Sequence, residues 1–77
     1  MYRIMKERGE WIKKRFRVRY IAYAVGVSPS YLSLVLSGKR CCSKSLAYCI
    51  VKTVDKESEI RDYFLRTNEN AKSNEEA

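Results

Sequence analysis

The sequence predicts an all-α fold, a small single-domain bundle of about five short helices. Three observations favour this fold. Apolar residues recur at three- and four-residue spacings along most of the chain, as they do on the buried face of a helix. Gly26, followed closely by Ser28 and Pro29, marks the end of one helix and the start of the next. The length of 77 residues leaves room for one domain only.

The first predicted helix covers residues 2–16. Its broad apolar face contains Ile4, Met5, Trp11, Ile12 and Phe16. Gly9 weakens a helix by about 1 kcal/mol relative to alanine, so we expect the helix to fray before this residue or to begin there. Trp11 and Phe16 are expected to belong to the core because both are large and lie on the apolar face.

Two further helices are predicted over residues 18–25 and 29–36. Gly26 ends the first of them in a left-handed conformation, and Ser28 caps the second, with Pro29 at its first position. Residues expected to face the core are Ile21, Ala22, Val25, Leu32, Val35 and Leu36. Residues expected to face outward are Ser30, Ser33, Leu34 and Ser37.

The last two predicted helices cover residues 44–54 and 57–67. Ser43 or Cys42 can cap the first of these, and its apolar stripe consists of Leu46, Ala47, Ile50, Val51 and Val54. Cys49 is expected to fill core space as a small hydrophobic residue. We therefore predict one domain over residues 1–67, followed by a disordered polar tail over residues 68–77.

Positive charge is concentrated in the predicted globular part. The net charge of the chain is +7, and residues 1–52 carry twelve Lys or Arg against two acids, whereas residues 53–77 carry four against seven. A concentrated positive field suits a polyanion, most simply nucleic acid. A solvated basic face that only keeps the protein soluble is the alternative explanation.

Composition argues against several other classes of protein. The chain has no histidine, and its three cysteines do not have a usual metal-ligand spacing, so we expect free thiols, no metal and no cofactor. No carboxylate pair lies in an apolar setting, so we expect no catalytic residue, no enzymatic activity and no small-molecule substrate. Residues 20–38 carry no charge and approach the length of a membrane span, but Ser28, Pro29 and Ser30 at the centre favour two soluble helices. We also expect a cytoplasmic location, since basic residues interrupt any N-terminal signal sequence.

The run I-A-Y-A-V-G-V-S-P-S-Y-L-S-L-V-L-S-G-K-R, residues 21–40, resembles the helix-turn-helix of Cro-like and lambda-repressor-like regulators. It also resembles the broader xenobiotic-response-element group of bacterial and phage transcription factors. The resemblance covers about residues 10–55. It implies a lambda-repressor-like DNA-binding fold with double-stranded DNA as the partner. The implied function is a small sequence-specific transcriptional regulator of phage or mobile-element type. Such a protein acts as a repressor by operator occupancy and associates with the nucleoid in the bacterial cytoplasm.

The resemblance also implies particular DNA contacts. Residues that match positions facing base edges in the major groove are Ser28, Ser30, Ser33, Leu34 and Ser37. Residues that match phosphate contacts are Tyr31, Lys39, Arg40, Ser43 and Lys44. The family often has glutamine where this chain has Val18, and the flanking Arg17 and Arg19 can replace that phosphate contact. The predicted recognition helix departs further from the pattern because it has no Arg, Lys, Asn or Gln to form bidentate base contacts.

Two alternatives remain open from the sequence. Ile60, Tyr63 and Phe64 are candidates for the dimer face of a homodimer, but the same residues could instead close the core of one chain. The whole chain could also be a protein-interaction module, such as an antirepressor or a partner that docks on another regulator. In that case its uncharged contact face would include Tyr31 and Leu34.

Overall fold

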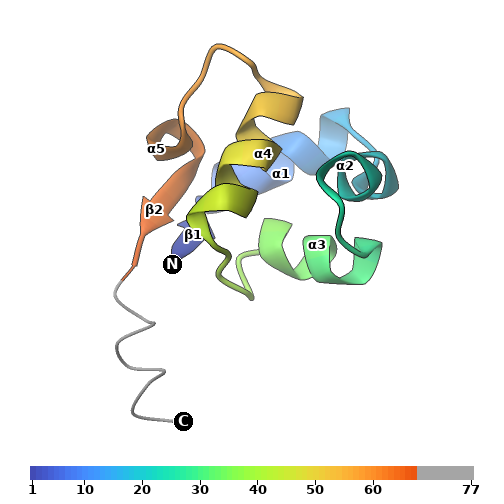
Figure 1. Ribbon diagram of the computed structural model, residues 1–77, viewed down its shortest axis with the longest axis horizontal. Helices are drawn as coiled ribbons and strands as arrows, with labels where there is room; N and C mark the ends of the chain where they lie inside the picture. Colours follow the sequence, from blue (N-terminus) through green and yellow to red (C-terminus); the bar gives the residue numbers. More distant parts are fainter. Residues whose placement is uncertain (68–77) are drawn as a thin grey trace, which may run out of the picture.

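A computed structural model describes residues 1–67, and the predicted disordered tail lies outside the described residues. The described part is a small domain with five helices and a short two-stranded sheet (Figure 1). In chain order the elements are β1 (Tyr2–Ile4), α1 (Lys6–Arg15), α2 (Val18–Val25), α3 (Pro29–Leu36), α4 (Lys44–Val54), α5 (Ile60–Tyr63) and β2 (Phe64–Arg66).

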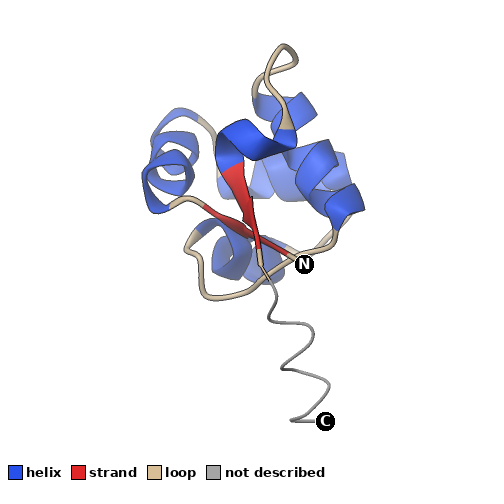
Figure 2. Cartoon of the chain, turned by 90° about the vertical axis from the view of Figure 1, so that its left-hand side faces the viewer, coloured by secondary structure: helices blue, strands red, loops and turns tan. Residues whose placement is uncertain are grey.

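The sheet corrects the prediction of an all-α fold. β1 and β2 are antiparallel, with Tyr2 opposite Arg66 and Ile4 opposite Phe64, and the two strands lie near the middle of the view in Figure 2. The first predicted helix was therefore too long at its start, since α1 begins only at Lys6. The fifth was too long at both ends, since α5 covers only Ile60–Tyr63. Pairing between segments sixty or more residues apart in the chain overrides the local helical spacing in both segments.

The three central helices agree with the predicted ranges. α2 and α3 have the predicted bounds, and α4 begins and ends at residues 44 and 54. The predicted caps also form, because Ser28 Oγ accepts a hydrogen bond from Tyr31 N–H and Ser43 Oγ accepts one from Leu46 N–H. These bonds satisfy amide groups that the first turn of a helix leaves unpaired.

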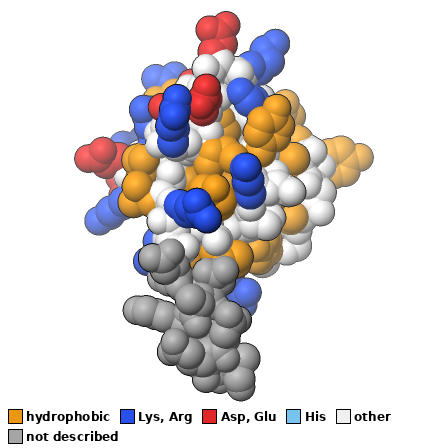
Figure 3. Space-filling view, turned by 60° about the vertical axis from the view of Figure 1, so that its left-hand side comes forward, with side chains coloured by type: hydrophobic (Ala, Val, Ile, Leu, Met, Phe, Trp, Pro, Cys, Tyr) orange, Lys and Arg blue, Asp and Glu red, His pale blue; other side chains and the backbone are white. Residues whose placement is uncertain are grey.

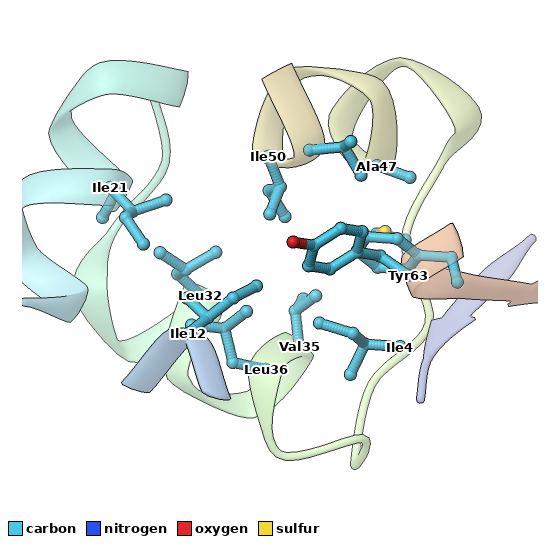
Figure 4. Close-up of a cluster of buried hydrophobic side chains, with 13 residues drawn as sticks. Ile4, Ile12, Ile21, Leu32, Val35, Leu36, Ala47, Ile50 and Tyr63 are labelled. Carbon is cyan, nitrogen blue, oxygen red and sulfur yellow. The ribbon is translucent and has the colours of Figure 1, made fainter. Parts of the chain in front are cut away.

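One hydrophobic core joins all of these elements (Figure 4). Its buried side chains are those of Ile4, Ile12, Ile21, Ala22, Leu32, Val35, Leu36, Cys42, Ala47, Ile50, Val51, Tyr63 and Phe64. Trp11, Phe16 and Val25 are half-buried and pack against this core. Within the described residues, no helix is both long and apolar enough to cross a lipid bilayer.

Tyr63 and Phe64 are only 1% and 2% exposed, so of the two alternatives that the sequence left open they close the core of one chain and do not offer a dimer face; Ile60 beside them is half-buried. The prediction for Cys49 is wrong. Cys49 is exposed, and Cys42 is the cysteine that fills core space. Burial, followed by the proximity of the Cys41 thiol, raises the pKa of Cys42 to about 11.

Asp55 organises the connection between α4 and α5. Its carboxylate accepts hydrogen bonds from the hydroxyl groups of Ser58, at 2.6 Å, and Tyr63, at 3.4 Å. The bond from Ser58 is the main reason why the pKa of Asp55 lies below its ordinary value, and burial raises the pKa of Tyr63. This cluster fixes the chain direction that leads into β2.

Gly9 allows α1 and α3 to approach each other closely. A Cβ atom added to Gly9 would overlap the carbonyl oxygen of Leu36, at the end of α3, and would also contact Ile4. Gly9 is a weak helix former, but the lack of a side chain brings the two backbones together. Gly9, which from the sequence alone is expected only to weaken the first helix, therefore allows α1 to pack closely against α3.

We predict that Gly9→Ala destabilises the protein although alanine is the better helix former. The added methyl group must displace backbone, and overpacking of this kind costs about 1–3 kcal/mol in the free energy of unfolding. Urea denaturation measures this loss. Glu10→Ala, at the exposed neighbouring position of α1, is the control and should change the free energy by less than about 0.5 kcal/mol. Equal stability of Gly9→Ala and the parent chain would contradict the close approach of α1 and α3.

Candidate nucleic-acid interface

The turn between α2 and α3 is tight and uses the left-handed conformation predicted for Gly26. The φ angle of Gly26 is 82°, and its N–H donates to Ala22 O at 2.8 Å, while the N–H of Val27 donates to the same oxygen at 3.0 Å. These bonds close the end of α2. Ser28 and Pro29 then start α3 at once, so the two helices are held at a short and defined separation.

α3 has one buried side and one exposed side. Leu32 and Val35 are fully buried, and Leu36 is 2% exposed. On the other side, Ser30 and Ser37 are exposed, Ser33 and Tyr31 are half-buried, and Leu34 is 37% exposed. The exposed side of α3 thus consists of small hydroxyl groups and one aliphatic side chain, as the sequence predicted.

Two cationic side chains border this exposed side. Arg19, in the first turn of α2, lines a shallow depression together with Ser30, Ser33 and Leu34. At the C-terminal end of α3, the ammonium group of Lys13 in α1 donates a hydrogen bond to Ser37 Oγ. The structure therefore brings Arg19 and Lys13 beside the serine residues of α3.

The basic pair after α3 is exposed. Gly38 has a φ angle of 80°, and the N–H of Lys39 donates to Leu34 O at 3.0 Å, which fixes where the chain leaves α3. Lys39 and Arg40 follow directly and are exposed. Arg17 is also exposed, at the N-cap of α2, but it does not line the depression that contains Arg19.

The remaining predicted phosphate contacts fall into two groups. Tyr31 and Ser43 line one depression between α3 and the start of α4. Lys44 does not join them, since it lines a different groove between α4 and β2. The hydroxyl oxygens of Ser28 and Ser43 are engaged in helix capping, and each hydroxyl keeps its proton as a donor.

Lys13 was missed by sequence reasoning. It lies on α1, away from the segment that resembles a helix-turn-helix, and nothing in its local spacing connects it to Ser37. The connection arises only because α1 packs against α3 at Gly9. No local sequence pattern identifies this contact.

Three comparisons, with models of protein families, with curated proteins and with solved structures, give no match for this chain. A functional assignment therefore depends on the residues and geometry described above.

Gly26→Val should destabilise the protein, whereas Gly26→Asn should be tolerated better. No atom lies within 4 Å of a Cβ added to Gly26, so the penalty comes from the backbone rather than from collision. A left-handed conformation costs an ordinary L-residue about 1–2 kcal/mol, more if it is β-branched and less for asparagine. Thermal unfolding of both variants measures the difference. Equal lowering of the melting temperature by Gly26→Val and Gly26→Asn would contradict a left-handed backbone conformation at this position.

Proposed function

We propose that this chain is a small sequence-specific DNA-binding protein in which α2 and α3 act as a helix-turn-helix. In this proposal the domain has a lambda-repressor-like DNA-binding fold, and α3 is the recognition helix that enters the major groove. The observation that carries the proposal is the exposed side of α3, which is free of charge itself and is bordered by the cations Arg19 and Lys13. Nucleic acid suits this arrangement because bases lie between two rows of phosphates.

The dimensions of α3 support this mode of binding. An α-helix with its side chains is about 10–12 Å across. This diameter fits the major groove of B-DNA, which is about 12 Å wide. Serine side chains are short enough to let the helix backbone come close to the base edges, and their hydroxyl groups can both donate and accept. Leu34 can contact the methyl group of thymine.

Phosphate contacts would supply most of the affinity. Arg19 and Lys13 border the exposed side, and Lys39 and Arg40 follow α3 in exposed positions. Each cation that neutralises a phosphate releases a counterion, so binding would weaken as salt is added. Lys13 is added to the proposed phosphate contacts because it forms a hydrogen bond with Ser37. Lys44 would contribute less to phosphate binding because it lines another groove.

Sequence preference would depend less than usual on direct base contacts. α3 carries no side chain that forms two hydrogen bonds with one base, so serine hydroxyls, the Leu34 contact, ordered water and DNA shape would share the discrimination. The proposed role is that of a repressor of phage or mobile-element type, acting by operator occupancy in the bacterial cytoplasm. Pairing of two copies would raise affinity, but the dimer face is unassigned because Tyr63 and Phe64 are buried.

A protein-interaction module, such as an antirepressor or a partner that docks on another regulator, is the second candidate. The observation that favours it is the same lack of base-reading side chains in α3, together with the exposed Leu34. Such a module would not bind duplex DNA in a salt-dependent manner.

Replacing both Lys39 and Arg40 with alanine should weaken binding to all duplex sequences. The slope of log K against log salt concentration should fall in magnitude by about one to two units, because two phosphate contacts are lost. Fluorescence anisotropy with a labelled random-sequence duplex at several salt concentrations measures both effects. Lys56→Ala with Arg61→Ala removes the same charge near α5 and is the control. An equal change of slope in both double variants would argue against a phosphate-binding role for Lys39 and Arg40.

A further inference from the structure

A second groove lies between α4 and β2, away from the exposed side of α3. We call it the α4–β2 groove, and residues that line it include Tyr2, Lys44, Tyr48, Lys52, Phe64 and Arg66. Its volume is about 590 Å³. Figure 3 faces this side of the molecule, where hydrophobic side chains lie between Lys and Arg side chains. Of the residues that line this groove, only Lys44 is also a proposed DNA contact.

The walls of the groove combine aromatic rings with cations. Lys44, Tyr48 and Lys52 follow one another at four-residue spacing, which places them on one side of α4. Tyr48 is 54% exposed, and the Lys52 ammonium group lies 5.6 Å from the centre of its ring. Buried Phe64 contributes apolar surface beneath them.

Within residues 1–67, no strand pairs with the outer edge of β2, which lies beside this groove. Thr67 N–H donates to Met1 O and Met5 N–H donates to Tyr63 O, so the odd-numbered residues of the two strands are the ones that bond across the sheet. In an antiparallel ladder the residues between them point their N–H and C=O groups the other way. On β1 this outer edge is used, because Tyr2 exchanges two hydrogen bonds with Cys42.

On β2 the same geometry directs three polar groups outward, Phe64 C=O, Arg66 N–H and Arg66 C=O. Phe64 N–H is already engaged with Ile60 O. Within residues 1–67 the sheet contains only β1 and β2, so no described strand covers this edge. An extended chain can add to such an edge through backbone hydrogen bonds, with its alternate side chains entering the adjacent groove.

The charge of the groove selects the kind of chain that fits. Four cations, Lys44, Lys52, Arg61 and Arg66, line it, against a single acid. That acid, Glu59, lies 3.4 Å from Arg61, so the groove keeps a positive excess. We propose that the α4–β2 groove binds an extended acidic segment of another protein, which adds as a strand to the outer edge of β2. Its alternate, acidic side chains would enter the groove and meet Arg66 and Lys44, and the side chains between them would lie on the opposite face of the sheet, the face of Leu65.

A second copy of this chain suits the groove less well. Two copies paired through β2 would bring their Arg66 side chains and groove cations together in a protein whose net charge is already +7. Repulsion between these charges opposes such a dimer. An acidic partner removes the repulsion instead.

The test is an amide chemical-shift titration of the full chain with a synthetic ten-residue peptide in which glutamate alternates with valine. A peptide with lysine in place of glutamate is the control. We expect shifts at Tyr48, Phe64 and Arg66 with the acidic peptide only. Lys39→Ala with Arg40→Ala should leave peptide affinity unchanged, so failure of this proposal and failure of DNA binding are distinguishable.

Two variants at one position separate the side chain from the backbone. Arg66→Ala removes charge and should weaken peptide binding severalfold. Arg66→Pro also removes the outward N–H and should weaken it by about a further three- to tenfold, as expected for one hydrogen bond. Proline is tolerated on an edge strand where its N–H would face outward. Leu65→Ala, on the opposite face of β2, should have no effect.

A peptide whose alternate amides are N-methylated gives the same information with the unaltered protein, and it should bind worse than its parent. Equal affinity of the methylated and parent peptides would overturn strand addition. Shifts confined to α3, or tighter binding of single-stranded oligothymidylate than of the acidic peptide, would overturn the assignment of the groove to an acidic segment. Self-association through β2 would do the same.

The chain's own last residues are also a candidate occupant, because residues 68–77 carry three glutamates and one lysine. Changing Glu69, Glu75 and Glu76 to glutamine tests this. Unchanged affinity for the acidic peptide supports an external partner. A large gain in affinity would show that the chain fills its own groove and would overturn the proposal.

Discussion

Three apolar side chains of α3, those of Leu32, Val35 and Leu36, are buried against the other helices, and their burial decides which way the rest of α3 faces. Because helical side chains repeat every 3.6 residues, burying this side leaves Ser30, Ser33 and Leu34 toward solvent. Gly26 limits the freedom of α3 at its start, and contact between Gly9 and the Leu36 carbonyl limits it at its end. The exposed side is thus held by packing at both ends.

The same packing places the charges. Arg19 comes beside the serine residues because α2 and α3 are held together by a tight turn, and Lys13 reaches Ser37 because α1 approaches α3 without an intervening side chain. The uncharged exposed side of α3 and the cations Arg19 and Lys13 therefore lie next to each other on the surface. The α4–β2 groove is a separate cationic surface, and it differs by having aromatic walls and a strand edge that no other described strand covers.

The sequence was sufficient to predict features that depend on near neighbours. The bounds of α2, α3 and α4, the left-handed Gly26 and the serine caps all follow from residues within one or two helical turns. The short strands could not be predicted, since Tyr2–Ile4 becomes a strand only by pairing with Phe64–Arg66 at the other end of the domain. The positions of Cys42 and Lys13 have the same origin. Tyr2 pairs with Cys42 across forty residues, and Lys13 meets Ser37 through contact between helices.

We propose that the exposed side of α3 binds duplex DNA. The most direct test is a set of ¹H–¹⁵N correlation spectra of the full chain, recorded as a random-sequence duplex is added at low salt. The measured quantity is the change in each amide chemical shift. We expect the largest shifts at Arg19, Ser30, Ser33 and Leu34, with smaller ones at Lys39 and Arg40. Shifts centred on Tyr48 and Arg66, with α3 unaffected, would contradict it.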